Sequence, residues 1–327
     1  PIDIGQPGAS PLPGGKEFHA ANINRPNLTY VGSDDGMLHA FFTRDTPMGG
    51  VTYIGGSEAF AYIPPEMLKV ITRIYAQGGQ KADPAAHIFG LASSPKVKSV
   101  CTANCGDPAT ALWKTLLVMT SGWGGYETMV LDITNPVNNQ AGTPTLFNNP
   151  PLQVQWHSEN YISSAASKLT YDNALGVTAS LPAFYFGKTA SLTDHRIIFA
   201  SGYKPVGSSI AGQGITVVSS NALTGAVIDD DRVVPPFDCT AQTTHAALTD
   251  VGTARNYAST EKGQILAGYF GDTWGNLWRY TPSITGGYTD NTGAVSLVQN
   301  FGCTSPLHFS PAIVQLDRDD PSNRPRE

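Results

Sequence analysis

The sequence predicts an all-β protein of the β-propeller class, with irregular blades, long loop insertions and one short helical insertion. Two observations indicate it: a strand, turn and strand pattern returns four times along the 327 residues, and a second strand-like piece lies between the returns. The returns are long and unevenly spaced, which favours sheets repeated around an axis over a solenoid with short, strict repeats. A β-sandwich is the alternative architecture.

Each return reads as an apolar strand, a turn with glycine and a second, alternating strand. The four copies are "TYVGSDDGMLHAFFT" (29–43), "LLVMTSGWGGYETMVLDIT" (116–134), "RIIFASGY…GQGITVVSSNALTG" (196–225) and "QILAGYFGDTWGNLWRYTP" (264–282). Tight hairpin turns need residues with positive φ, and glycine adopts that conformation without a steric clash. The pattern therefore predicts hairpins with turn glycines at Gly36, Gly125, Gly214 and Gly275.

The piece between the hairpins is a short alternating run preceded by small residues. Its four copies are "SSPKVKSV" (93–100), "SSAASKLTYD" (163–172), "THAALTDVG" (244–252) and "FSPAIVQLD" (309–317). We interpret each as the strand that opens a sheet. Residues 309–316 would then begin a blade that 27–33 and 36–42 complete, which joins the chain ends and removes open sheet edges.

One helix is predicted within "IPPEMLKVITRIYA" (63–76), as an insertion after the first hairpin. Pro65 suits a first turn, and Met67, Leu68, Ile71 and Ile74 are expected on one face. The expected organisation is an entering segment over 1–26, the propeller over 27–316 and a polar tail over 317–327. A chain that begins at Pro1 indicates a processed protein or a piece of a longer one.

Composition excludes several classes of function. Charged residues make up 14% of the chain, the net charge is -6 and no basic run occurs, which argues against nucleic acid as a partner. No window approaches the length of apolar sequence that a membrane-spanning helix needs. Apolar residues make up 41%, enough for a sizeable core.

The four cysteines, Cys101, Cys105, Cys239 and Cys303, allow three pairings. Sequence proximity favours Cys101 with Cys105 and, by elimination, Cys239 with Cys303. A zinc site would want two close pairs, and only CTANC provides one. Disulfides are therefore favoured, with chain-entropy contributions of about 2 and about 4 kcal/mol. They indicate an oxidising compartment.

Catalytic and metal-binding patterns are lacking. The seven histidines form no HExxH motif and no Cys-His spacing, and His39 is expected to be a packed or rim residue. No GxSxG nucleophile motif occurs. The acidic runs at 228–232 and 316–320 are interpreted as solvated turn residues. A group of four aromatic residues could stack on sugars but is expected to fill the space between sheets: Trp123, Tyr126, Trp274 and Trp278.

The succession "YVGSDDGMLHAF", "AFAYIPPEML", "LLVMTSGWGGYETMVLDITNP" and "GYFGDTWGNLWRY" resembles the C-terminal propeller of PilY-type proteins, from about Tyr30 to about Leu316. This family comprises type IV pilus biogenesis factors and tip-associated adhesins. The resemblance implies a secreted, non-enzymatic protein at the pilus tip, exported through the periplasm. It would bind minor pilins, support pilus assembly, retraction control and twitching motility, and contact host or abiotic surfaces.

One departure from the family concerns calcium. Family members with a calcium site carry closely spaced Asp and Asn residues before the strand that matches "ILAGYFGDTWGNLW". Here residues 248–264 offer only Asp250 and Asn256 as oxygen ligands, whereas calcium takes six to eight. We therefore expect no cofactor, and calcium binding at this position is doubtful.

Two other classes of function remain as alternatives. One is a quinone-dependent oxidoreductase, because Gly-turn hairpins also occur in quinoprotein propellers, although no adjacent cysteine pair and no CxxCH haem motif occurs. The other is a secreted carbohydrate-binding propeller.

Overall fold

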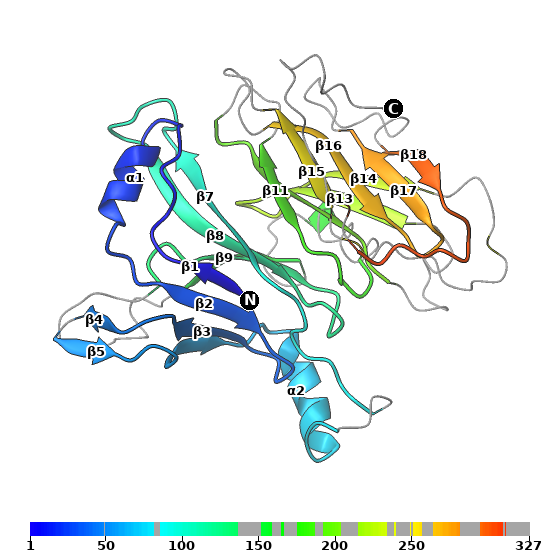
Figure 1. The fold of residues 1–327 in the computed structure, drawn as a ribbon, viewed down its shortest axis with the longest axis horizontal. Coiled ribbons are helices and arrows are strands. Elements are labelled where there is room, and N and C mark those ends of the chain that lie inside the picture. Colours follow the sequence, from blue (N-terminus) through cyan, green and yellow to red (C-terminus); the bar gives the residue numbers. More distant parts are fainter. Residues whose placement is uncertain are drawn as a thin grey trace, which may run out of the picture.

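The computed structural model describes residues 1–327 except 49, 82–85, 137–151, 159–164, 167–174, 187–191, 204–214, 234–238, 240–248, 250, 257–263, 282–294, 310 and 312–327. The described strands form four successive groups of four antiparallel strands, here called blades 1 to 4 (Figure 1). The all-β prediction is confirmed, and the described residues close no ring of sheets. The expected polar tail, residues 317–327, lies outside the described residues.

The first two blades are separate sheets. Blade 1 consists of β1 (Ile2–Ile4), β2 (Leu28–Gly32), β3 (Leu38–Phe42) and β6 (Glu58–Tyr62). A small hairpin of β4 (Thr46–Met48) and β5 (Val51–Tyr53) lies between β3 and β6 in the chain. Blade 2 consists of β7 (Lys96–Ala103), β8 (Leu112–Thr120), β9 (Thr128–Asp132) and β10 (Gln153–His157).

Blades 3 and 4 share one sheet. Blade 3 consists of β11 (Ala183–Phe186), β12 (His195–Ala200), β13 (Ile215–Asn221) and β14 (Val227–Val233). Blade 4 consists of β15 (Gly252–Asn256), β16 (Gln264–Gly271), β17 (Asn276–Tyr280) and β18 (Val295–Asn300). A short parallel pairing between Phe186 of β11 and Gln264 of β16 joins the two blades.

The four predicted hairpins are present as β2–β3, β8–β9, β12–β13 and β16–β17, each with antiparallel pairing. Of the predicted opening strands, 93–100 overlaps β7, and 244–252 reaches only the first residue of β15. The other two copies lie almost wholly outside the described residues. In blade 1 the strand beside β2 is β1, from the segment that the sequence assigned to the entering region.

The predicted helix is confirmed as α2 (Met67–Ala76), which packs against the β2–β3 turn and extends away from the sheets (Figure 1). The expected apolar face was wrong at one position. Met67 and Val70 are buried, whereas Leu68 is 55% exposed. The buried face of the helix therefore includes Val70 and excludes Leu68, because Val70 lies on the face of Met67 at the i, i+3 spacing.

The core consists of separate layers between successive blades. One buried cluster joins residues of β2, β3 and α2 to β8 and β9, a second joins β8 and β9 to blade 3, and a third joins blade 3 to blade 4. Strand β8 shows how this is achieved. Leu117 and Met119 contribute to the first cluster, and Leu116 and Val118 contribute to the second. Alternate residues of one strand thus enter two different cores.

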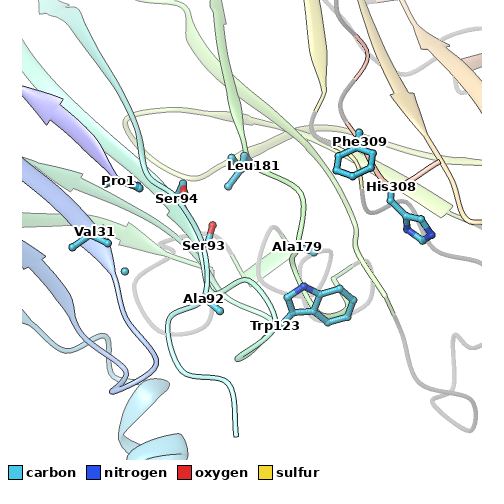
Figure 2. Close-up of a pocket in the computed structure, with 11 residues that line it drawn as sticks. Pro1, Val31, Ala92, Ser93, Ser94, Trp123, Ala179, Leu181, His308 and Phe309 are labelled. Atoms are coloured by element: carbon cyan, nitrogen blue, oxygen red, sulfur yellow. The ribbon is translucent and has the colours of Figure 1, made fainter. Parts of the chain in front are cut away.

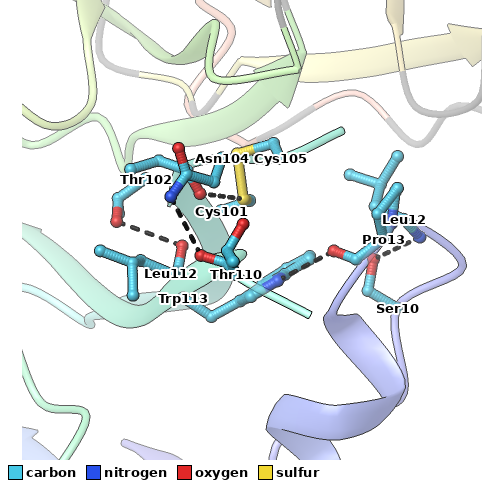
Figure 3. Close-up of a disulfide and its surroundings, with 11 residues drawn as sticks. Ser10, Leu12, Pro13, Cys101, Thr102, Asn104, Cys105, Thr110, Leu112 and Trp113 are labelled. Atoms are coloured by element: carbon cyan, nitrogen blue, oxygen red, sulfur yellow. Dashed lines mark hydrogen bonds between the residues drawn. A yellow bond between two sulfur atoms is a disulfide. The ribbon is translucent and has the colours of Figure 1, made fainter. Parts of the chain in front are cut away.

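Both cysteine pairs are joined, Cys101 to Cys105 and Cys239 to Cys303, the pairing that sequence proximity favoured. The short disulfide packs on Trp113, whose indole nitrogen donates to the Pro13 carbonyl at 3.1 Å (Figure 3).

Trp113 also holds a helix that the sequence did not predict, α1 (Gly15–Ala21). The ring of Phe18 in α1 stacks on the Trp113 indole, with 6.0 Å between ring centroids. The residues that precede β2 are therefore anchored to blade 2 through α1 and paired with β2 through β1.

Three leucines of β8 test the layered core with one chemical change. L116A and L117A should each lower the free energy of unfolding by about 2–5 kcal/mol, because each leaves a cavity in a different core. L112A should change it by about 0.5 kcal/mol or less, because Leu112 is 58% exposed. Urea unfolding of the three variants measures these differences. A loss for L116A as small as that for L112A would contradict burial of both faces.

Candidate functional site

The hairpin turns of blades 1, 2 and 4 share one backbone arrangement. The first turn residue donates its N–H to the carbonyl that begins the second strand: Ser33 to Met37 at 3.0 Å, Ser121 to Glu127 at 2.8 Å, and Asp272 to Asn276 at 3.0 Å. In each, a glycine N–H returns to the carbonyl of that first residue. The turns are therefore rigid, hydrogen-bonded structures.

The structure places two of the four predicted turn glycines in the expected backbone conformation. Gly36 and Gly275 have φ of 87° and 75°, as the hairpin pattern required. Gly214 lies outside the described residues. The assignment of Gly125 was wrong, because the left-handed residue in that turn is Gly122, with φ of 64°.

Gly125 is needed for space rather than for conformation. A Cβ at this position would collide with the Glu66 carboxylate. That carboxylate accepts the backbone N–H of Tyr126 at 2.9 Å and the Ser121 hydroxyl at 3.4 Å. The segment that begins α2 is thereby fixed to the β8–β9 turn.

Linking segments between blades connect the turns to one another. The Leu91 N–H donates to the Ser33 carbonyl at 2.9 Å, and the next N–H, of Ala92, donates to the Ser121 carbonyl at 3.2 Å. One short segment thus bridges the turns of blades 1 and 2.

The same arrangement recurs further along the chain. The Thr178 N–H donates to the Gly125 carbonyl of the β8–β9 turn at 3.1 Å. The Gly176 N–H donates to the Ser201 carbonyl, which directly follows β12, at 2.8 Å. After blade 4, the Leu307 N–H donates to Asp272 at 2.9 Å. Each of these bonds pairs a backbone N–H of a linking segment with a carbonyl of a hairpin turn.

A buried side-chain relay also joins blades 1 and 2. The His157 ring contacts the Tyr62 hydroxyl through Nε2 at 2.9 Å and the Glu127 carboxylate through Nδ1 at 2.5 Å. An ionised Glu127 carboxylate can only accept, so Nδ1 donates to it, and Nε2 and the Tyr62 hydroxyl share the second hydrogen bond. His157 and Glu127 are fully buried, so this relay is a structural bridge rather than a site that substrate can reach.

His39 occupies the rim position that the sequence favoured. It lies on β3 between Glu58 at 2.5 Å and Asp35 at 2.9 Å, and its side chain is 16% exposed. Burial alone would lower the pKa of His39, but the hydrogen bonds and charges of the two carboxylates outweigh it and raise the pKa. The ring thereby ties the β2–β3 turn to β6, and its protonated form is the one that both carboxylates favour.

His195 behaves in the opposite way. It is 1% exposed at the start of β12, and burial together with the charge of Lys98 lowers the pKa of His195 to about 4. It is therefore neutral in the folded protein near neutral pH.

The hairpin turns and linking segments border a cavity of about 520 Å³. Figure 2 shows its walls: Val31 of blade 1, Ala92–Ser94 before blade 2, Trp123 of the β8–β9 turn, Ala179 and Leu181 before blade 3, and His308 and Phe309 after blade 4. The cavity thus lies where blade 1, the β8–β9 turn and the segments that flank blades 3 and 4 come together. Trp123 is the one member of this set that the sequence suggested as a ligand contact; the others come from five further segments that share no local pattern.

The aromatic residues that were expected to fill the space between sheets divide into two groups. Trp278 is 2% exposed and does fill a core, with its indole nitrogen donating to Asp272 at 2.8 Å. Trp123 and Tyr126 do not, because they are 48% and 51% exposed on the β8–β9 turn. Their exposure corrects the expectation, and of the two residues only Trp123 lines the cavity.

The weak calcium position is only partly described. Asp250 lies outside the described residues, and Asn256 ends β15, where its backbone pairs with Gln264. Within the described ranges, no group of three or more His, Cys, Asp or Glu is arranged to hold a metal ion. The expectation that calcium binding at this position is doubtful stays a prediction.

His39 predicts a pH dependence of stability. A raised folded pKa stabilises the protein below the unfolded pKa of about 6.5, and this contribution is lost as pH rises through the folded value. His195 is present in both wild type and H39Q, so its own pH-dependent contribution cancels in the difference between them. The stability difference between wild type and H39Q should therefore shrink from pH 6 to pH 9 in urea unfolding.

E58Q provides the matched variant for this test, because it removes one of the two carboxylates that hold His39. It should retain part of the pH dependence, through Asp35. A difference between wild type and H39Q that is constant or grows with pH would contradict the role of the two carboxylates.

Comparison with known proteins finds no matching protein-family model. The chain is 31% identical over 121 residues to the type IV pilus biogenesis factor PilY1 of Pseudomonas aeruginosa strain PAO1, which covers 37% of this chain and 9% of that protein. It is 27% identical over 266 residues to PilY1 of strain UCBPP-PA14, covering 80% of this chain and 18% of that protein. The chain spans less than a fifth of these curated relatives.

A solved structure shows the same fold. The crystal structure of the Pseudomonas aeruginosa PilY1 C-terminal domain superposes with a TM-score of 0.63 at 18% identity, over 99% of this chain and 57% of that chain. The β-propeller prediction is thereby confirmed at the level of fold. The PilY1 relatives and this shared fold together support the assignment of the chain as a PilY-type C-terminal domain.

Proposed function

We propose that this chain is the C-terminal propeller of a type IV pilus biogenesis factor that acts at the pilus tip by binding minor pilins. In this role it supports pilus assembly, retraction control, twitching motility and adhesion to host or abiotic surfaces. It acts by protein binding rather than catalysis and needs no cofactor.

One observation carries the proposal: sequence similarity to PilY1 extends over 80% of the chain, and the fold of the PilY1 C-terminal domain extends over 99% of it. The name of those relatives states a role in pilus biogenesis.

The two disulfides support an exported protein. Such bonds form and persist in oxidising compartments such as the periplasm and the cell surface. Among the helices of the described residues, none is both long and apolar enough to cross a membrane. We therefore propose export through the periplasm to the pilus tip.

The architecture also suits a binding role. Hydrogen-bonded turns and linking segments hold the ends of the blades in place, and exposed loops on a rigid scaffold commonly form binding surfaces. The exposed Trp123 and Tyr126 on one such turn have the character of interface residues, where aromatic side chains are enriched.

Substitutions of the β8 leucines in cells that make pili test whether the proposed role requires the folded propeller. Full-length protein with L117A should reduce the number of surface pili and the amount of minor pilins that co-purify with it, because the core between blades 1 and 2 is weakened. L112A, on an exposed position of the same strand, should leave both unchanged.

Two results would contradict the proposal. One is normal piliation in cells that lack the protein. The other is recovery of the wild-type protein only in free form, with no minor pilins attached, which would favour the oxidoreductase or carbohydrate-binding alternatives.

A further inference from the structure

The cavity bordered by the four blades has the size of a small-ligand site. Its volume of about 520 Å³ falls within the range of about 300–1,000 Å³ typical of such sites. Its walls come from blade 1, from the β8–β9 turn of blade 2 and from the segments that precede blades 2 and 3 and follow blade 4 (Figure 2).

The aromatic side chains at the cavity, Trp123 and Phe309, are exposed, whereas three other tryptophans are buried in the cores. Trp113, Trp156 and Trp278 are at most 8% exposed. Each also donates its indole N–H to an oxygen of the protein, at 2.8–3.1 Å. Trp123 is 48% exposed and Phe309 is 89% exposed. Their ring faces contribute little to the cores and are available to a ligand.

The charge of the lining points to a neutral ligand. Among the described residues that line the cavity there is no Asp, Glu, Lys or Arg. Transfer of an ionised ligand from water into this cavity would cost free energy, because no lining Asp, Glu, Lys or Arg offers a counter-charge. The polar groups present are the hydroxyls of Ser93 and Ser94 and the ring of His308, which suit hydroxyl groups of a ligand.

The backbone beside the cavity argues against an extended peptide. A peptide that adds to a sheet needs an unpaired strand edge. Here Ala92 is already bridged to Gly122, and Val177 is bridged to Tyr203. A compact ring with an apolar face and hydroxyl edges fits the remaining features better.

We propose that the cavity binds a neutral saccharide. One sugar ring stacks its apolar face on Trp123, and its hydroxyl groups hydrogen-bond to Ser94 and His308. This ligand goes beyond the proposed role in pilus assembly and does not depend on it, since a pilus-tip protein and a free secreted protein could both carry such a site.

The test uses the purified chain and a panel of neutral probes: the methyl glycosides of glucose, galactose and mannose, N-acetylglucosamine, and their disaccharides. Binding is measured by saturation-transfer NMR and titration calorimetry. At least one probe should bind at millimolar concentration or below, and W123A should weaken that binding about tenfold, the loss expected for one aromatic stacking contact.

Y126A is the matched control, because Tyr126 lies on the same turn and is 51% exposed but does not line the cavity. It should bind the probe as wild type does, and W123F should retain most of the affinity. Thermal unfolding of the three variants verifies that each is folded.

Four outcomes would overturn the proposal. The first is that no neutral probe binds at millimolar concentration. The second is equal loss of binding in W123A and Y126A. The third is a preference for sialic acid over every neutral sugar. The fourth is that a proline-rich peptide binds more tightly than any sugar and is lost in W123A, which would assign the cavity to peptide recognition. None of these depends on whether the protein binds pilins.

Discussion

Burial of a sheet on both of its faces is the constraint on which the rest of this structure depends. Because successive residues of a strand point to opposite faces, β8 supplies four consecutive apolar side chains, Leu116 to Met119, to fill two cores. This explains how a chain with only 14% charged residues folds as a stack of sheets. It also sets the distance between blades, since each core has to be filled without cavities.

Close packing of sheets brings their turns together, and buried backbone groups there need partners. The linking segments meet this need. The backbone N–H groups of Leu91 and Ala92 donate to the turns of blades 1 and 2. Those of Thr178 and Gly176 donate in the same way to the turns of blades 2 and 3. The turn of blade 2 gains a further contact, because the absence of a side chain at Gly125 admits the Glu66 carboxylate. The cavity walls are therefore held by the same bonds that hold the blades in register.

Local chemistry in the sequence predicted the repeating frame but not the contacts between repeats. Glycine turns and alternating strands identified the hairpins, and the spacing of Met67, Ile71 and Ile74 identified α2. Gly122 and Gly125 could not be told apart, since one needs positive φ and the other needs space for a residue about 60 positions away. The bridge between Tyr62 and His157 and the cavity at Trp123 and Phe309 depend on tertiary packing, which has no local pattern.

Native-state hydrogen exchange tests most directly whether the linking segments hold the blades together. We expect the amides of Leu91, Ala92 and Thr178 to exchange only through global unfolding, with protection equal to that of core amides in β8. Exchange of these three amides by local opening, while β8 stays protected, would contradict this expectation, because the blades would then be held by side-chain packing alone.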